Sequence, residues 1–157
     1  LNGNAGHNLI FGNKGNNTLN GGAGDDTLFA GIGGTNILIG GTGTDHMRGN
    51  SGVDIFKFNA LNEMSVGVKQ DDVFNFTTDA DKSGSGDKLD FSALKGYKFV
   101  GEADDFTGVA KELRYETGSD ELGNYVVLYG NSNTDHVADF SIKLIGVAAL
   151  TAADLVL

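Results

Sequence analysis

The chain has 157 residues, including 25 glycines but no cysteine or proline, and its formal net charge at pH 7 is −10. This length is enough for one domain with a modest core. The absence of cysteine excludes disulfides, thiol catalysis and cysteine-based zinc sites. The negative charge disfavours nucleic acid and anionic membranes as partners and fits a protein that binds cations, and no stretch is long enough to span a membrane.

Residues 1–57 repeat with a period of nine. The clearest unit is 21–29 (GGAGDDTLF), of the form G-G-x-G-x-D-x-U-x, in which U is a large apolar residue. The units are 3–11, 12–20, 21–29, 31–39, 40–48 and 49–57. Ala30 is then one extra residue; placing the extra residue at Ile39 also works, but puts Thr35 rather than Asn36 at position six. Glycines at a fixed phase of nine predict a right-handed parallel β-roll of the calcium-binding type.

Each unit has a turn and a short strand. Gly, Asn and Asp in the first six positions tolerate the positive φ angles of a tight turn. Three strand residues follow, and position eight points inward. That position is always large and apolar: Ile10, Leu19, Leu28, Leu38, Met47 and Phe56. Because two units make one coil, we expect each unit to stack on the next but one.

Position six supplies the candidate metal ligands. It is occupied by Asn8, Asn17, Asp26, Asn36, Asp45 and Asp54. Stacked turns bring backbone carbonyls and these side chains into one gap, and Ca²⁺ prefers six to eight oxygen ligands with some carboxylate charge. The gap that holds both Asp26 and Asp45 is therefore the strongest predicted site.

The other gaps hold at least one asparagine. Asn36 faces Asp54, and Asn8 faces Asp26, so each of these gaps has one carboxylate. Asn17 and Asn36 give a gap with two neutral amides, which we expect to be the weakest site or empty. A flexible linker is a poor alternative for this segment, because linkers do not hold an apolar residue at a nine-residue phase.

These repeats resemble the RTX (repeats-in-toxin) β-roll of proteins exported by type I secretion. The resemblance implies that position-six carboxylates bind calcium together with turn carbonyls. The turn residues concerned are Gly21, Gly22, Ala23, Gly24, Gly31, Gly33, Gly40, Gly41, Thr42, Gly43, Gly49 and Ser51. Asparagine at position six in three units departs from the family pattern.

Residues 58–157 have a different composition, and we predict a mainly antiparallel β cap that covers the end and flank of the roll. The outward apolar residues of the roll, such as Leu9 and Phe11, should lie under it. In chain order we expect a strand at 72–76, a polar loop at 77–87, a strand end or helical turn at 88–94, a hairpin with strands 113–116 and 125–129, a strand at 138–145 and a helical turn at 151–154. The whole chain is thus predicted to be all-β, with 1–57 and 58–157 forming one cooperative module.

Two polar loops of the cap are weaker calcium candidates. Asp79, Asp81, Asp87 and Asp90 imitate the spacing of an EF-hand loop, but without the flanking helices or the terminal glutamate. A solvated acidic loop is the favoured interpretation. The segment 131–139 also has spaced Asn and Asp residues, and a strand-connecting turn is the better interpretation there.

The segment 71–157 also resembles a known domain. The stretches DKLDFSAL, DDFTGVAKELRYE and ADFSIKLIGVAALTAADLVL are similar to the C-terminal domain of serralysin-type secreted metalloproteases, and the calcium modules of alginate epimerases have similar repeats. The resemblance implies a secretion signal at 154–157, type I secretion machinery as a partner, and a secreted parent enzyme on the N-terminal side, such as a metalloprotease, epimerase or lipase.

The sequence predicts a module without catalysis of its own. No H-E-x-x-H zinc motif, nucleophile elbow or phosphate-binding loop is present. The leading hypothesis is a secreted, extracellular module that folds when it binds several Ca²⁺ ions. The alternative is a polysaccharide-binding module for a polymer such as alginate. An ice-binding face is disfavoured, because the outward positions form no threonine ladder.

Overall fold

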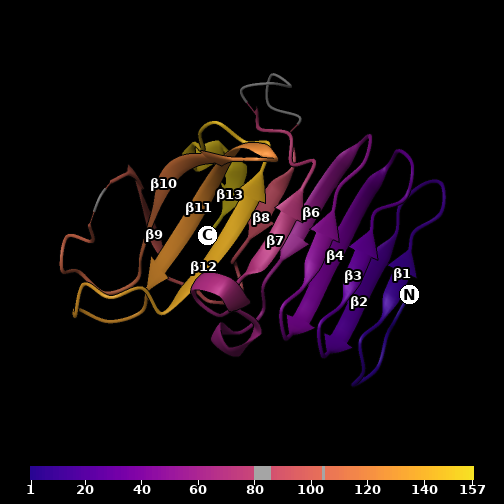
Figure 1. The fold of residues 1–157 in the computed structure, drawn as a ribbon, viewed down its shortest axis with the longest axis horizontal. Coiled ribbons are helices and arrows are strands. Elements are labelled where there is room, and N and C mark those ends of the chain that lie inside the picture. The colour runs from indigo at the N-terminus through magenta and orange to yellow at the C-terminus, as the bar shows by residue number, and fades with distance from the viewer. Residues whose placement is uncertain (80–85, 104) are drawn as a thin grey trace.

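The structure is a computed structural model and describes residues 1–79, 86–103 and 105–157 (Figure 1). It is nearly all-β, which confirms the predicted fold class. The strands are β1 (Leu9–Phe11), β2 (Thr18–Ala23), β3 (Thr27–Phe29), β4 (Thr35–Thr42), β5 (His46–Arg48), β6 (Val53–Lys57), β7 (Asp71–Phe74), β8 (Lys88–Asp90), β9 (Lys98–Glu102), β10 (Glu112–Asp120), β11 (Gly123–Asn131), β12 (Phe140–Ile145) and β13 (Leu155–Val156). Short 3-10 turns are η1 (Leu61–Glu63), η2 (Gly67–Lys69) and η3 (Ala152–Asp154).

The nonapeptide units form two parallel sheets that face each other. Strands β1, β3 and β5 pair in one sheet, and β2, β4 and β6 pair in the other. Thr27 pairs with His46 across β3 and β5, so each unit stacks on the next but one, as predicted. Asn36 pairs with Asp54 across β4 and β6, which places Asn36 at position six and Ala30 as the extra residue.

The parallel stacking continues past residue 57. Strand β7 pairs with β5, and β8 pairs with β6. In this register Asp71 and Asp87 occupy position six, while Val73 and Leu89 occupy position eight and are fully buried. Residue 57 therefore marks the end of the regular glycine pattern, whereas the two sheets run on through β7 and β8.

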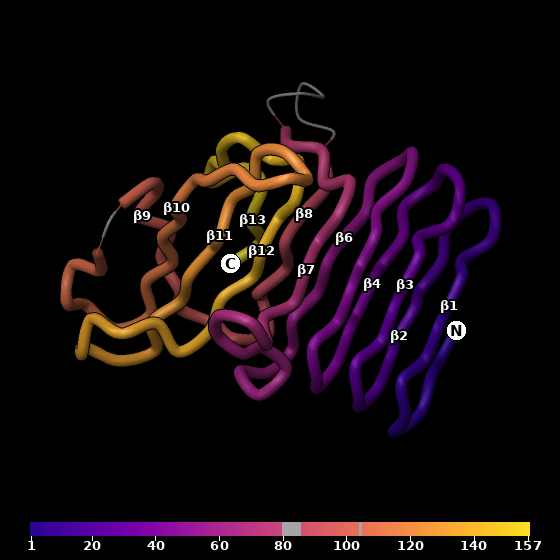
Figure 2. The backbone as a smooth tube through the Cα atoms, in the orientation of Figure 1, coloured from indigo at the N-terminus to yellow at the C-terminus, as the bar shows by residue number. Residues whose placement is uncertain are grey.

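The remaining strands extend the same two sheets (Figure 2). Beyond β7 the first sheet adds β12, β11, β10 and β9, and beyond β8 the second adds β13. Strands β10 and β11 form the predicted hairpin. Pairing runs to Asp120 and Gly123, so the connecting turn is shorter than the predicted one, because the polar residues at the hairpin end still form ladder hydrogen bonds.

In the roll, the core lies between the two sheets and is built from position eight. Leu19, Leu28, Leu38, Met47 and Phe56 are all fully buried. Burial of each such side chain stabilises the fold by about 1.5–3 kcal/mol. Within the described residues, no helix has the length and apolar character needed to cross a membrane.

The outer face of the roll is not covered as predicted. Leu9 and Phe11 are 63% and 58% exposed. The second half of the chain adds strands at the end of the sheets, so it cannot lie over the outer face of β1. Instead the ring of Phe11 stacks on that of Phe29, with their centroids 4.7 Å apart.

Candidate metal centre

Position-six side chains form a ladder along the first edge of the roll, which consists of the turns 3–8, 21–26, 40–45 and 66–71. The backbone N–H of Asn8 donates to Oδ1 of Asp26 at 2.7 Å. The N–H of Asp26 donates to Oδ1 of Asp45, and that of Asp45 to Oδ1 of Asp71, both at 2.8 Å. One oxygen of each carboxylate is therefore used to bond the preceding turn.

A second ladder follows the other edge, which has the turns 12–17, 31–36 and 49–54. The backbone N–H of Asn17 donates to Oδ1 of Asn36 at 3.1 Å, and Nδ2 of Asn36 donates to Oδ1 of Asp54 at 2.9 Å. The N–H of Asp54 then donates to Oδ1 of Asp87 at 2.9 Å. Asn36, Asp54 and Asp87 are fully buried.

The first edge contains two buried carboxylate oxygens without partners. Among the described residues, Oδ2 of Asp26 and Oδ2 of Asp45 are buried and accept no hydrogen bond. A Cβ placed on Gly21 would overlap Oδ2 of Asp26 and lie 2.6 Å from the carbonyl oxygen of Gly40. Oδ2 of Asp26 and the carbonyl oxygen of Gly40, from the stacked turn, therefore border one small space, the hollow of turn 21–26. Oxygens are the ligands that Ca²⁺ prefers.

Turn 40–45 repeats this arrangement. A Cβ on Gly40 would overlap Oδ2 of Asp45, and the next carboxylate along the edge belongs to Asp71. In both turns, Oδ2 of the position-six aspartate borders the hollow and is buried without a hydrogen-bond partner. A buried charged oxygen in such a place is costly unless a cation or a proton accompanies it.

The pKa values of these carboxyls reflect the same crowding. Burial, followed by the charge of neighbouring aspartates, raises the pKa of Asp45 to about 6 and that of Asp71 to about 8. Burial also raises the pKa of Asp26. A divalent cation in the hollows would remove this penalty, because it favours the ionised form.

Glycine is required where neighbouring turns touch. Gly22 and Gly41 have φ angles of +109° and +101°, which glycine adopts without strain. A Cβ on Gly41 would overlap the carbonyl oxygen of Gly22 in the adjacent turn. Gly24 and Gly43 also have positive φ. These residues let the turns approach closely enough to share one hollow.

Other predicted carbonyl ligands already accept hydrogen bonds. The carbonyl of Thr42 accepts from the N–H of Gly24, and that of Ser51 accepts from the N–H of Gly33, both at 2.8 Å. The carbonyl of Gly49 accepts from Nδ2 of Asn75 at 3.2 Å. Ala23 pairs with Thr42 at the end of β2 and β4. The carbonyls of Gly31 and Gly33 accept from the side-chain amide of Asn36.

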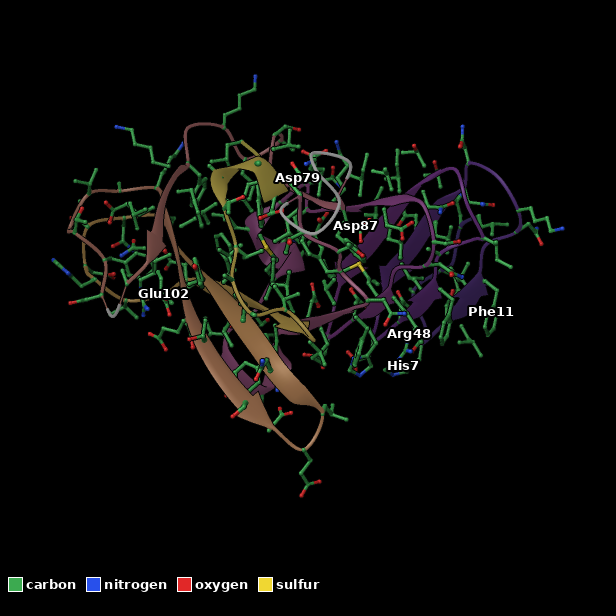
Figure 3. All side chains as sticks on the ribbon, turned by 90° about the horizontal axis from the view of Figure 1, so that it is seen from above. His7, Phe11, Arg48, Asp79, Asp87 and Glu102 are labelled. Carbon is green, nitrogen blue, oxygen red and sulfur yellow. The ribbon has the colours of Figure 1, made fainter. Side chains whose placement is uncertain are left out.

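The described members of the EF-hand-like set, Asp79, Asp87 and Asp90, form no common metal-binding group. Asp79 forms an ion pair with Lys88, and Asp90 forms one with Lys57 at 2.9 Å. Asp87 lies in the second-edge ladder, and Figure 3 shows it beside the roll. Asp81 lies outside the described residues. Within the described chain, no group of three or more Asp, Glu and His side chains is placed to hold a metal ion.

The segment 131–139 forms hydrogen-bonded turns. Oδ1 of Asn131 accepts from the N–H of Asn133, and Oδ1 of Asn133 accepts from the N–H of Asp135, both at 2.7 Å. Oδ2 of Asp139 accepts from the N–H of Ser132 at 2.6 Å. These side chains stabilise the connection between β11 and β12, which is the interpretation that the sequence favoured.

Sequence reasoning missed Asp71 and the true position of Asp87. Neither residue follows a G-G-x-G pattern, which was the signal used to find the repeats. A weaker signal was present, since both 71–74 (DDVF) and 87–90 (DKLD) keep the D-x-U-x ending of the nonapeptide. Searching for that ending alone would have found both.

Comparison with known proteins agrees with this geometry. The family of the RTX calcium-binding nonapeptide repeat (4 copies) matches residues 2–34 and 31–60. These are RTX calcium-binding repeats. The match implies that this repeat segment binds Ca²⁺. Repeats of this kind are typical of secreted proteins.

Two solved structures with a similar fold come from one enzyme. The AlgE6R2 subunit of the Azotobacter vinelandii mannuronan C5-epimerase is 25% identical, with a TM-score of 0.66 over 99% of this chain and 90% of that one. The AlgE6R3 subunit of the same epimerase is 23% identical, with a TM-score of 0.50 over 90% and 78% of the two chains. No curated protein matches the sequence.

Proposed function

We propose that this RTX module folds when it binds calcium outside the cell and thereby stabilises a larger secreted protein. The observation that carries the proposal is the pair of buried, unpartnered oxygens of Asp26 and Asp45. Type I secretion passes an unfolded chain, so a module that stays unfolded until it meets calcium suits that route. The parent protein would lie on the N-terminal side.

The energetics favour coupled folding and binding. Burying an ionised carboxylate without a partner costs several kcal/mol, and the first edge buries a row of them. A domain has a total stability of only about 5–15 kcal/mol. At neutral pH the metal-free roll is therefore disfavoured, and the free energy of calcium binding becomes folding free energy.

We also propose that residues 1–57 and 58–157 fold as one cooperative module. The ladders that carry Asp45 and Asp54 end on Asp71 and Asp87, which belong to the second half. Strands β7 and β8 also close the end of the roll core with Val73 and Leu89. A single unfolding transition by both circular dichroism and tyrosine fluorescence would support this.

A calcium titration followed by far-UV circular dichroism tests the proposed function. Starting from excess chelator, we expect a steep, cooperative gain of β signal with calcium. Extracellular calcium modules have dissociation constants of about 10⁻⁴–10⁻³ M, so the midpoint should lie there. Magnesium at the same concentration should have no effect, because it demands a smaller octahedral site. A full β signal in chelator would refute the proposal.

A groove on the outer face of the roll favours a second function, the binding of an acidic polysaccharide. Thr27, Phe29, His46, Arg48 and Phe74 line a groove of about 200 Å³. The guanidinium of Arg48 lies 5.0 Å from the centre of the Phe74 ring, and Figure 3 shows Arg48 and Phe11 along one side of the roll. A cation beside an aromatic ring suits a sugar carboxylate, and the solved relative belongs to an epimerase of mannuronan.

Titration with mannuronan oligomers, followed by NMR of the calcium-loaded module, tests this second function. We expect shifts at the backbone amides of Phe29, Arg48 and Phe74. The variant Arg48→Ala should weaken binding at least about tenfold, which corresponds to roughly 1.4 kcal/mol. The variant Lys57→Ala, on the other sheet, serves as the matched control. Equal binding by both variants, or no shifts, would rule out the groove as the binding site.

A further inference from the structure

We propose that an asparagine at position six takes the place of the calcium ion in its own turn. Calcium then binds only where position six is an aspartate with a free oxygen, in the hollows of turns 21–26 and 40–45. This inference rests on the proposed calcium-dependent folding, and it specifies which turns require the metal. It is carried by what the side-chain amides of Asn8, Asn17 and Asn36 contact.

Asn17 shows the substitution most completely. Its Nδ2 donates to the carbonyl oxygens of Asn13 at 2.8 Å and Gly15 at 2.9 Å, both in its own turn. The same Nδ2 lies 3.0 Å from Oδ1 of Asn36 in the stacked turn. Nδ2 of Asn17 thus contacts three oxygens from two turns. A calcium ion would bind oxygens in the same arrangement.

Asn36 repeats the pattern one coil further along. Its Nδ2 approaches the carbonyl oxygens of Gly31 at 3.2 Å and Gly33 at 3.4 Å, and it donates to Oδ1 of Asp54 at 2.9 Å. The other oxygen of Asp54 accepts from the N–H of Asn50 at 2.6 Å. Asp54 is therefore fully buried with hydrogen bonds to both of its oxygens.

Asn8 fills the first turn in the same way. Its Nδ2 donates to the carbonyl oxygen of Gly6 at 2.5 Å, and its Oδ1 accepts from the N–H of Asn4 at 2.8 Å. All three asparagine turns are thus closed by an internal donor. The pattern occurs on both edges of the roll, so it follows from the residue type and not from the place in the fold.

The aspartate turns lack this donor. Asp26 and Asp45 have a second oxygen, an acceptor, instead of an amide nitrogen, and among the described residues neither Oδ2 atom has a hydrogen-bond partner. Gly40 contributes a further acceptor beside Asp26. A buried carboxylate oxygen beside another acceptor requires a cation or a proton. The amide–carboxylate contact between Asn36 and Asp54 also shows how asparagine can face the next aspartate without metal.

The decisive variant is the double substitution Asp26→Asn with Asp45→Asn. If the amide replaces the ion, this variant should form the roll in excess chelator, and its β signal should no longer depend on calcium. The matched control, Asp26→Ala with Asp45→Ala, removes the carboxylates without adding donors. It should remain disordered in chelator and fold poorly even with calcium.

Far-UV circular dichroism and native mass spectrometry, each with and without calcium, separate the outcomes. A disordered Asp→Asn variant in chelator, beside a parent chain that folds with calcium, would overturn this inference and leave the proposed function intact. Folding of the Asp→Ala control in chelator would also overturn it, because loss of charge alone would then suffice. A parent chain already folded in chelator would instead overturn the proposed function.

The reverse substitution keeps the inference testable if the double variants misfold. Asn36→Asp removes the donor beside Asp54 and creates a second carboxylate in that gap. The parent chain should bind calcium only at the two aspartate hollows, and this variant should bind one ion more. A parent chain that already binds at turn 31–36, seen as calcium-dependent NMR shifts of the Asn36 side-chain amide, would contradict the assignment.

Discussion

Acidification is expected to replace calcium in part: the metal-free module should gain β structure as the pH is lowered from about 8 to about 5. Burial raises the pKa of Asp45 to about 6 and that of Asp71 to about 8, from the ordinary value of 3.8. Between pH 5 and pH 8, the folded state holds protons on these carboxyls that the unfolded state has released. Stability therefore falls as the pH rises through the window, and the contribution is lost above the folded pKa.

The size of the effect follows from the pKa shifts. At pH 5, one unit below its folded pKa, the Asp45 carboxyl stabilises the metal-free fold by about 1.4 kcal/mol relative to pH 8. Asp71, with the higher pKa, adds to this. Asp79 does not oppose the effect, because the ion pair with Lys88 lowers the pKa of Asp79 and keeps it ionised at pH 5.

Circular dichroism of protein freed of calcium on a chelating resin, at pH 8 and at pH 5, checks this prediction. Chemical denaturation at pH 5 gives the free energy of unfolding. The variant Asp45→Asn with Asp71→Asn is the control, because it lacks these two titrating groups, and its stability should change less than that of the parent chain over the same range. A parent chain that remains equally disordered at pH 5 would show that something other than carboxylate charge prevents folding.

The repeat pattern predicted the roll because it is periodic and local. Leu28 and Met47 are buried at position eight because only a large apolar side chain fills the space between two facing sheets. Stacking of alternate units followed from the same periodicity. The sequence also identified Asp26 and Asp45 as the pair of carboxylates in one gap, since stacking fixes which turns meet.

Other features depend on contacts that no local pattern records. Asp71 reaches position six by pairing β7 with β5 across a segment of different composition. Sequence reasoning counted the oxygen of Asn36 as a ligand, whereas its nitrogen points at the turn carbonyls. The exposure of Phe11 was also unforeseen, because its cover depended on whether the cap packs on the face or on the end of the sheets.

Replacing Gly21 with alanine is expected to block calcium binding in the hollow of turn 21–26. A Cβ at this position would overlap Oδ2 of Asp26 and lie 2.6 Å from the carbonyl oxygen of Gly40. The methyl group would therefore push these two oxygens out of their positions. Gly21 does not have a positive φ, so alanine adds no strain of that kind and the effect is one of space.

The expected loss is that of one bound ion. An ion present at one hundred times its dissociation constant stabilises the fold by about 2.7 kcal/mol, so the free energy of unfolding in calcium should fall by about that amount. Gly6→Ala is the matched control: Gly6 also lacks a positive φ, and its Cβ would meet only side-chain atoms, Oδ1 of Asn4 at 3.3 Å and Nδ2 of Asn8 at 4.0 Å.

Denaturation in millimolar calcium and in chelator, together with an ion count by native mass spectrometry, checks the Gly21→Ala prediction. With calcium present, Gly21→Ala should lose an ion and Gly6→Ala should match the parent chain. In chelator all three should be equally disordered, because none of them forms the roll without metal. If Gly21→Ala kept the full number of ions, the hollow beside Asp26 would not be the binding site, and the buried oxygens of Asp26 and Asp45 would need another explanation.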